Sequence, residues 1–263
     1  MTAQPADAPA TPASDGHLLT REFLLAGRLP EAIARWNPDI KVLSDAERTA
    51  SLHDMLARRP ERGGGVWVFA YGSLIWNPMI HHTGRLAAHA PDWHRAFCLS
   101  TPGGRGTPEN PGLMLGLRPG GGCTGVAFRI EESLVEAELD LLWRREMVAR
   151  GYIPHWVALH HRDGRDMGAA VAFTIDPGGP FYAGDLPEPV VARRLATARG
   201  HLGTAAEYLY RTRDGLREIG IECPFVERIA ALVDNETAAV LRPPPPSDRQ
   251  MSCRMTIMGV ADV

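Results

Sequence analysis

The segment FAYGSLIWNP, from Phe69 to Pro78, contains residue types that suit the binding of an anion. A short run of β-branched and aromatic residues, Val66 to Ala70, predicts a buried strand that ends at Tyr71-Gly72-Ser73. Glycine at a strand exit lets the backbone turn sharply and approach a ligand, and successive N–H groups there can hold a carboxylate or an oxyanion. An ordinary strand end, with a serine hydroxyl completing a turn, is the structural alternative.

A second candidate for chemistry is a glutamate in the segment LWRREMVARGY. The pattern predicts a helix from Ser133 to Arg150. One stripe of this helix, at steps of four, three and four residues, consists of Val135, Leu139, Leu142 and Glu146. A carboxylate therefore occupies a position where the pattern calls for a buried apolar side chain. Partial desolvation raises the pKa of a carboxyl group, which suits a general base that acts on an amine near neutral pH.

Residue types alone leave another interpretation of Glu146 open. With Arg150 it can form an i,i+4 ion pair on a solvated helix face, which stabilises a helix by only a few tenths of a kcal/mol. Perturbed carboxylates also occur in purely structural networks.

Cofactor signatures are absent from the sequence. Neither a GxxxxGK[ST] loop nor an HExxH motif occurs, and the glycines at 103–106 and 120–122 lack the strand and helix context of a dinucleotide fold, so they predict flexible turns. The histidine pairs at 81–82 and 160–161 would point to opposite faces of a strand, without a third ligand at a suitable spacing. We therefore expect no metal and no cofactor.

The composition is that of a soluble globular protein, with 44% hydrophobic and 22% charged residues in a chain of 263. A formal net charge of -3 and scattered arginines give no basic patch for nucleic acid or an anionic membrane. The sequence shows no signal-peptide pattern and no apolar run of the ~20 residues that a membrane span needs, so we expect a cytoplasmic location. Reduced thiols are expected for the four cysteines, which form no CxxC pair: Cys98, Cys123, Cys223 and Cys253.

Several elements are predicted to position the two candidate segments. Residues 1 to 18 predict a disordered tail, and residues 19 to 59 a helical segment that contains a capping box of Ser44 and Glu47. Short strands separated by glycine and proline clusters indicate a compact antiparallel or mixed sheet, which can close into a barrel. These strands are Val66 to Ala70, Trp93 to Ser100, Leu113 to Pro119 and Thr124 to Ile130.

The second half of the chain predicts a hairpin around Asp163-Gly164, followed by helices from Val190 to Gly203 and from Ala205 to Ile219. A proline run at 243–246 marks a solvent-exposed C-terminal extension, residues 242 to 263.

Together these segments resemble the ChaC-type γ-glutamylcyclotransferases. The resemblance extends in order from about Leu19 to about Leu241, and its specific feature is a YGSL turn followed later by a WxRE segment. It is carried by VWVFAYGSLIWNP (66–78), GR (84–85), WHRAFCL (93–99), RGTPENPG (105–112), TGVAFRI (124–130), LLWRREM with the following GY (141–152) and AEYLY (206–210).

The resemblance implies an α+β fold, a γ-glutamylcyclotransferase-like small mixed β-barrel flanked by helices. The domain would span residues 19 to 241, with a helical extension at about 19 to 62. It also implies a cofactor-free cleavage of glutathione to 5-oxo-L-proline and L-cysteinylglycine. Carried over residue by residue, Glu146 is the proton acceptor, and the substrate-binding turn is Ala70, Tyr71, Gly72, Ser73, Leu74 and Ile75. Ala70 departs from the glycine that is often found there, and its methyl group can narrow the pocket.

Three further side chains are candidates for substrate binding. Tyr71 and Tyr152 can hydrogen-bond the polar groups of the substrate, and Arg95 can pair with its carboxylate. Each has a structural alternative, a core aromatic for the tyrosines and a surface charge for Arg95. Two other functions stay open: a cyclotransferase for other γ-glutamyl amino acids or amines, and a non-catalytic γ-glutamyl-binding interaction protein. We expect a monomer whose partner is the small-molecule substrate.

Overall fold

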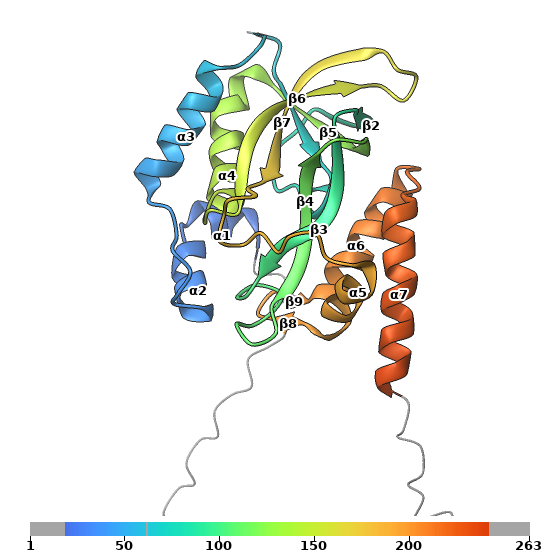
Figure 1. Ribbon diagram of the computed structural model, residues 1–263. Helices are drawn as coiled ribbons and strands as arrows, with labels where there is room; N and C mark the ends of the chain where they lie inside the picture. The colour runs from blue at the N-terminus through green and yellow to red at the C-terminus, as the bar shows by residue number, and fades with distance from the viewer. Residues whose placement is uncertain (1–18, 62, 242–263) are drawn as a thin grey trace, which may run out of the picture.

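The computed structural model describes residues 19–61 and 63–241 (Figure 1). The predicted disordered tail, residues 1 to 18, and the C-terminal extension, residues 242 to 263, lie outside this range. Within the described residues, no helix is both long and apolar enough to cross a bilayer.

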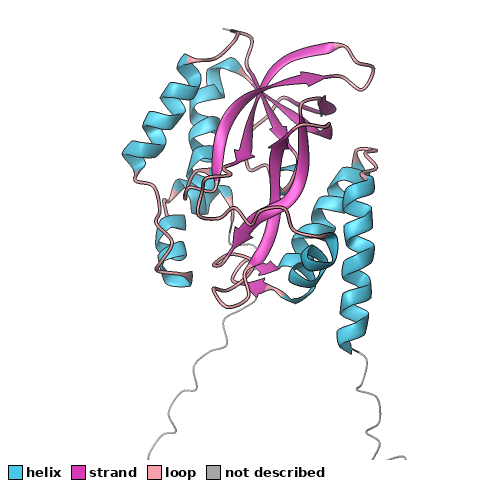
Figure 2. Ribbon diagram, viewed as in Figure 1, coloured by secondary structure: helices cyan, strands magenta, loops and turns pink. Residues whose placement is uncertain are grey.

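Five strands close into a small barrel at the centre of the fold (Figure 2). β1 pairs in parallel with β7, whereas the other neighbours are antiparallel, so the barrel is mixed. This confirms the predicted fold class. In their order around the barrel the strands are β1 (Val66–Ala70), β5 (Cys123–Ile130), β2 (Gly84–Ala90), β6 (Tyr152–His160) and β7 (Asp166–Ile175).

A long hairpin of β3 (Trp93–Thr101) and β4 (Gly112–Pro119) forms a separate two-stranded sheet against the barrel. All four strands predicted in the first half of the chain are present, and each lies within one residue of its predicted bounds. β2 was not predicted, because GRLAAHA contains no β-branched or aromatic residue. Its strand conformation comes from continuous antiparallel pairing with β5 and from the buried methyl groups of Ala88 and Ala90.

On one side of the strands lie α1 (Arg21–Leu25), α2 (Leu29–Trp36), α3 (Asp45–Ala57) and α4 (Val135–Glu146), the last preceded by the 3-10 turn η2 (Glu132–Leu134) (Figure 1). The predicted capping box is present at the start of α3, where Ser44 and Glu47 bond each other's backbone N–H groups.

The helix predicted to end at Arg150 ends four residues earlier, at Glu146. Residues beyond it leave the helix because the Val148 carbonyl accepts a hydrogen bond from Leu43 N–H at 2.9 Å, and Ala149 forms a β-bridge with Val42. Backbone pairing with the segment after α2 thus replaces the last predicted turn.

The other side of the strands is covered by α5 (Glu188–Thr197), α6 (Ala205–Glu218) and α7 (Pro224–Leu241) (Figure 1). The predicted helix to Gly203 was wrong beyond Thr197, since the chain there forms the hairpin of β8 (Arg199–Gly200) and β9 (Gly203–Thr204). Gly200 packs so closely on the backbone of Gly104 that a Cβ would lie 2.3 Å from its carbonyl oxygen. No element was predicted for α7.

The stripe predicted on α4 is buried in the core that α4 shares with the barrel. Leu139 and Leu142 are 0% and 1% exposed, and Trp143 packs edge-on against Phe173 of β7 at 5.1 Å between ring centroids. The helix that carries Glu146 is therefore fixed by apolar packing along its length.

Replacing Leu139 by alanine is expected to lower the free energy of unfolding by about 2–5 kcal/mol, because the neighbours cannot fill the space left behind. Urea unfolding followed by circular dichroism measures the change. The matched control is Glu136→Ala on the exposed face of the same helix, which should change the stability by less than about 0.5 kcal/mol. Equal effects of both substitutions would contradict the packing described here.

Candidate active site

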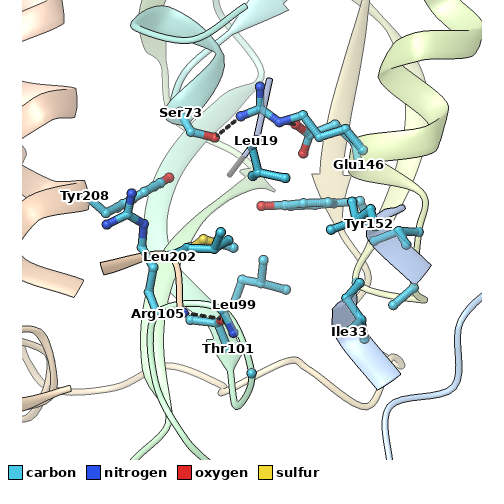
Figure 3. Close-up of a pocket in the computed structure, with 18 of the residues that line it drawn as sticks. Leu19, Ile33, Ser73, Leu99, Thr101, Arg105, Glu146, Tyr152, Leu202 and Tyr208 are labelled. Atoms are coloured by element: carbon cyan, nitrogen blue, oxygen red, sulfur yellow. Dashed lines mark hydrogen bonds and ion pairs between the residues drawn. The ribbon is translucent and has the colours of Figure 1, made fainter. Parts of the chain in front are cut away.

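A cavity of about 470 Å³ opens between the end of α4, the β3–β4 hairpin, the N-terminal helices and α6. Figure 3 shows Glu146 and Ser73 at one end of this cavity and Leu99 and Thr101 at the other, with Tyr208 and Arg105 on one side and Tyr152 and Ile33 facing them. A water-sized void of about 20 Å³ lies next to the Glu146 end of the cavity. The turn after β1 lines this void together with Glu146.

Glu146 is the last residue of α4, and its side chain is only 12% exposed. Its Oε1 lies 2.8 Å from Nε of Arg145, yet among the described residues no group donates a hydrogen bond of good geometry to this buried oxygen. A buried carboxylate oxygen without a directed donor is costly, and it is well suited to accept an N–H from a bound amine.

Burial raises the pKa of the Glu146 carboxyl above its ordinary value, and the charge of Arg145 opposes part of this shift. A carboxylate with a raised pKa is a stronger base than a solvated one. The structure thus supports the predicted buried position, and it places Arg150 on the surface, paired with Glu47 instead of Glu146.

The turn after β1 lies beside Glu146. The void between them is lined by Tyr71, Gly72, Ser73 and Leu74. Ser73 starts the 3-10 turn η1 (Ser73–Ile75), and the first N–H groups of such a turn have no acceptor within it, so they are suited to a ligand carboxylate or oxyanion. Position 72 requires glycine because the Tyr208 side chain lies against its backbone, and a Cβ there would lie 2.6 Å from the Tyr208 hydroxyl oxygen.

Arg145 connects the turn to Glu146. Its Nη2 donates to Ser73 Oγ at 2.7 Å and its Nη1 to the Asn77 carbonyl at 2.5 Å, while Nε faces Glu146. One nearly buried guanidinium therefore fixes the distance between the carboxylate and the turn, which chain connectivity alone does not determine.

Three tyrosines complete this end of the cavity, of which Tyr71 and Tyr208 are buried and Tyr152 is half-buried. Tyr152 donates to the Leu115 carbonyl at 3.1 Å, and Tyr208 accepts from the Leu115 N–H at 3.2 Å. Tyr71 donates to the Phe173 carbonyl. Burial raises the pKa of Tyr208 to about 12 and holds the pKa values of Tyr71 and Tyr152 well above their usual range, so all three are neutral phenols.

Three predicted site residues are not at the cavity. Ala70 is wholly buried in the barrel, and Ile75 packs on the far side of the turn against Gly215 of α6. Arg95 is neither a surface charge nor a cavity residue, which corrects both interpretations made from the sequence. It is buried, its Nη2 donates to the Thr124 carbonyl at 2.5 Å, and Cys123 and Cys223 lie beside it.

Sequence reasoning missed Arg145, Tyr208 and Arg105 as cavity residues. Arg105 is 6% exposed and donates to the Thr204 carbonyl at 2.8 Å and to Glu207 at 3.2 Å. A signal for all three was present, since each lies within a motif that carried the resemblance. Their neighbours across the cavity come from distant parts of the chain, which no local pattern reveals.

Within residues 19–61 and 63–241, no group of three or more His, Cys, Asp or Glu side chains is arranged to hold a metal ion. The chemistry available at the cavity is that of a buried carboxylate, neutral phenols, guanidinium groups and backbone N–H donors.

Comparison with solved structures shows which known fold the chain adopts. A crystal structure described as a γ-glutamyl cyclotransferase specific to glutathione from yeast matches with a TM-score of 0.62 at 20% identity, covering 68% of this chain and 100% of the yeast chain. The barrel with its flanking helices is thus a γ-glutamylcyclotransferase-like fold.

Sequence comparison identifies the family. Residues 66–236 match the family model described as ChaC-like protein. The glutathione-specific gamma-glutamylcyclotransferase of Escherichia coli (strain K12) is 41% identical over 231 residues, which cover 86% of this chain and 99% of that protein. The glutathione-specific gamma-glutamylcyclotransferase 1 of Homo sapiens is 32% identical over 172 residues, covering 64% and 77%. The chain belongs to the ChaC-like family.

Removing the charge of Arg145 is expected to raise the pKa of Glu146 further. In the parent protein, NMR titration of ¹³C-labelled glutamate carboxyl groups should show Glu146 titrating above the ordinary value of about 4.3. In an Arg145→Met variant its midpoint should move upward again, because desolvation then acts without a nearby cation. Arg144→Met, which removes the neighbouring guanidinium that pairs with Asp140, is the control and should leave the midpoint unchanged. A Glu146 midpoint in the ordinary range in the parent would mean that the carboxyl is solvated.

Proposed function

We propose that this protein is a glutathione-specific γ-glutamylcyclotransferase, with Glu146 as the general base and the turn from Tyr71 to Leu74 as the binding site of the γ-glutamyl group. The reaction would convert glutathione to 5-oxo-L-proline and L-cysteinylglycine. The similarity of the chain to the Escherichia coli enzyme, over 99% of that enzyme's length, supports the activity. The cytoplasmic location and the monomeric state expected from the sequence stay predictions.

The observation that carries the proposal is the buried Glu146 oxygen without a directed donor, at the cavity end that the Tyr71–Leu74 turn also lines. A γ-glutamyl peptide brings an ammonium group, an α-carboxylate and a γ-carbonyl. The ammonium can donate to the carboxylate while the backbone N–H groups of the turn receive a carboxylate or the developing oxyanion.

The reaction requires no nucleophile from the protein. The α-amine of the γ-glutamyl group can reach its own γ-carbonyl and close a five-membered lactam, which makes the attack intramolecular. Glu146 takes a proton from the ammonium, and the free amine attacks the γ-carbonyl to give the tetrahedral intermediate. The attacking nitrogen loses a second proton as the lactam forms, and the leaving nitrogen gains two, so cysteinylglycine leaves with an ammonium group. Glu146 can carry these two protons one after the other. Arg145 keeps the base and the turn at a fixed separation through its bonds to Ser73 and Asn77.

The cavity is lined by more guanidinium groups than carboxylates, although Arg21 and Arg105 are paired with Glu138 and Glu207. Four arginines line it, Arg21, Arg105, Arg145 and Arg211, whereas Glu146 is the single carboxylate among its described lining residues. Glutathione carries two carboxylates and one ammonium, so its glycine carboxylate can pair with an arginine outside the reacting end. Arg105 and Arg211 are the candidates for binding the glycine carboxylate in place of Arg95. Their guanidinium carbons lie 5.9 and 4.1 Å from the centroid of the Trp76 ring.

A substrate comparison separates the proposal from its nearest rival, a cyclotransferase for other γ-glutamyl compounds. Release of 5-oxoproline should be at least tenfold more efficient, as kcat/KM, from glutathione than from γ-glutamylalanine, which places its terminal carboxylate closer to the scissile bond. Release from γ-glutamylalanine alone would reject glutathione as the substrate, and release from neither would reject the enzyme.

Replacement of the base tests the mechanism. Glu146→Gln keeps the shape of the side chain but removes the proton acceptor, so kcat should fall by about 10²–10⁴-fold. Thermal unfolding and calorimetric binding of glutathione should show that the fold and the affinity are largely kept. Glu136→Gln, at a 75% exposed position of the same helix, is the control with expected parent activity. Undiminished turnover of Glu146→Gln would remove Glu146 from the mechanism.

A further inference from the structure

The end of the cavity away from Glu146 has an apolar wall. Among the residues of this wall, Leu29, Ile33 and Leu99 are 5%, 9% and 6% exposed. Trp36, Ile40 and Leu202 are half-buried. We define the apolar wall by the side chains of Leu29, Ile33, Trp36, Ile40, Leu99 and Leu202.

Most of the apolar wall comes from α2 and the residues just after it. Leu29, Ile33 and Trp36 are spaced by four and three residues and therefore share one face of α2. This face is turned toward a cavity, although apolar helix faces ordinarily pack against a solid core. The segment precedes the residues 66–236 that match the family model.

Contacts on several sides hold the apolar wall in place. Arg21 of α1 binds Glu138 of α4 with two bonds of 2.6 and 2.7 Å and the Met79 carbonyl at 2.9 Å. The Trp36 ring stacks on His201 of the β8–β9 turn, with centroids 5.4 Å apart and planes 11° from parallel. The wall is therefore built into the fold.

The side of the cavity that faces α2 carries polar groups beside the apolar side chain of Leu202. In Figure 3 Arg105 and Tyr208 lie on the left of the cavity, and Ile33 lies on the right, below Tyr152. With the γ-glutamyl group beside Glu146 and the glycine carboxylate on the arginine side, the cysteine side chain of the peptide is left facing the apolar wall. A thiol covers little of such a surface, and the peptide groups gain nothing from contact with it.

We propose that the apolar wall binds an alkyl or aryl group on the cysteine sulfur, so that the protein also cleaves S-substituted glutathione. This inference rests on the proposed function and extends its substrate class. The α-amine attacks the γ-carbonyl carbon, the bond from that carbon to the cysteinyl nitrogen breaks, and Glu146 carries two protons, one after the other, from the amine to the leaving nitrogen. The products are 5-oxoproline and the S-substituted cysteinylglycine, and the thioether is unchanged.

A chain-length series tests the inference on the full-length protein. Release of 5-oxoproline is measured from glutathione and from its S-methyl, S-propyl and S-hexyl derivatives. We expect kcat/KM to rise by about threefold for each methylene that reaches the apolar wall, as expected for burial of an alkyl chain, until the space is filled.

Substitutions on α2 test whether the alkyl group binds at the apolar wall. The quantity measured is the ratio of kcat/KM for S-hexylglutathione to kcat/KM for glutathione. Ile33→Trp fills the space and should lower the ratio at least tenfold. Ile33→Thr, which keeps the branch at Cβ but replaces the ethyl arm by a hydroxyl, should lower it about threefold and guards against misfolding of the larger substitution. Ala34→Trp, at the adjacent exposed position, is the matched control and should leave the ratio unchanged.

The outcomes are distinct. Cleavage of glutathione without cleavage of any S-alkyl derivative overturns this inference and leaves the proposed function intact. A ratio that is unaffected by both Ile33 substitutions also overturns it, since the alkyl group then binds elsewhere. If neither glutathione nor its derivatives release 5-oxoproline, the proposed function fails as well.

Discussion

The contacts of Arg145 with Glu146, Ser73 and Asn77 are the constraint on which the rest of the site depends. They join the C-terminal end of α4 to the turn after β1, two segments that are far apart in the chain. The pairing has a double effect. It holds the carboxylate at the cavity, and its charge limits how far burial can raise the pKa of that carboxylate. A carboxylate buried without a cation would stay protonated to a higher pH. A carboxylate whose oxygens all accept hydrogen bonds from the protein would have none left for a ligand.

Strong local patterns in the sequence were sufficient for much of the fold. VWVFA predicts β1 because its residues favour a buried strand, and the stripe that ends at Glu146 predicts the buried face of α4 because helical periodicity relates those positions directly. Local patterns failed where tertiary contacts determine the conformation. β2 is a strand because β5 pairs with it, and α4 ends early because the segment around Val42 and Leu43 takes up the next backbone groups.

The site was predictable to the same extent. Tyr71 to Leu74, Glu146 and Tyr152 line the Glu146 end of the cavity, and these positions followed from strand-exit glycine chemistry, helical periodicity and family motifs. The position of Arg95 could not be predicted, because a single arginine within a strand does not reveal which face of the strand it occupies or which groups it contacts there. The substrate itself follows from relatives and not from geometry, since a carboxylate beside a backbone turn suits γ-glutamyl compounds in general.

The position of α1 and α2 in the chain affects how the protein assembles. These helices are near the start of the described residues, yet Arg21 bonds to Glu138, 117 residues later, and Trp36 stacks on His201. Contacts that close such long loops form after local ones, because the loop entropy must be offset before the contact contributes. The wall of the cavity therefore depends on contacts between α1 and α2 and parts of the chain as late as the β8–β9 turn, and the cavity is complete only when both are present.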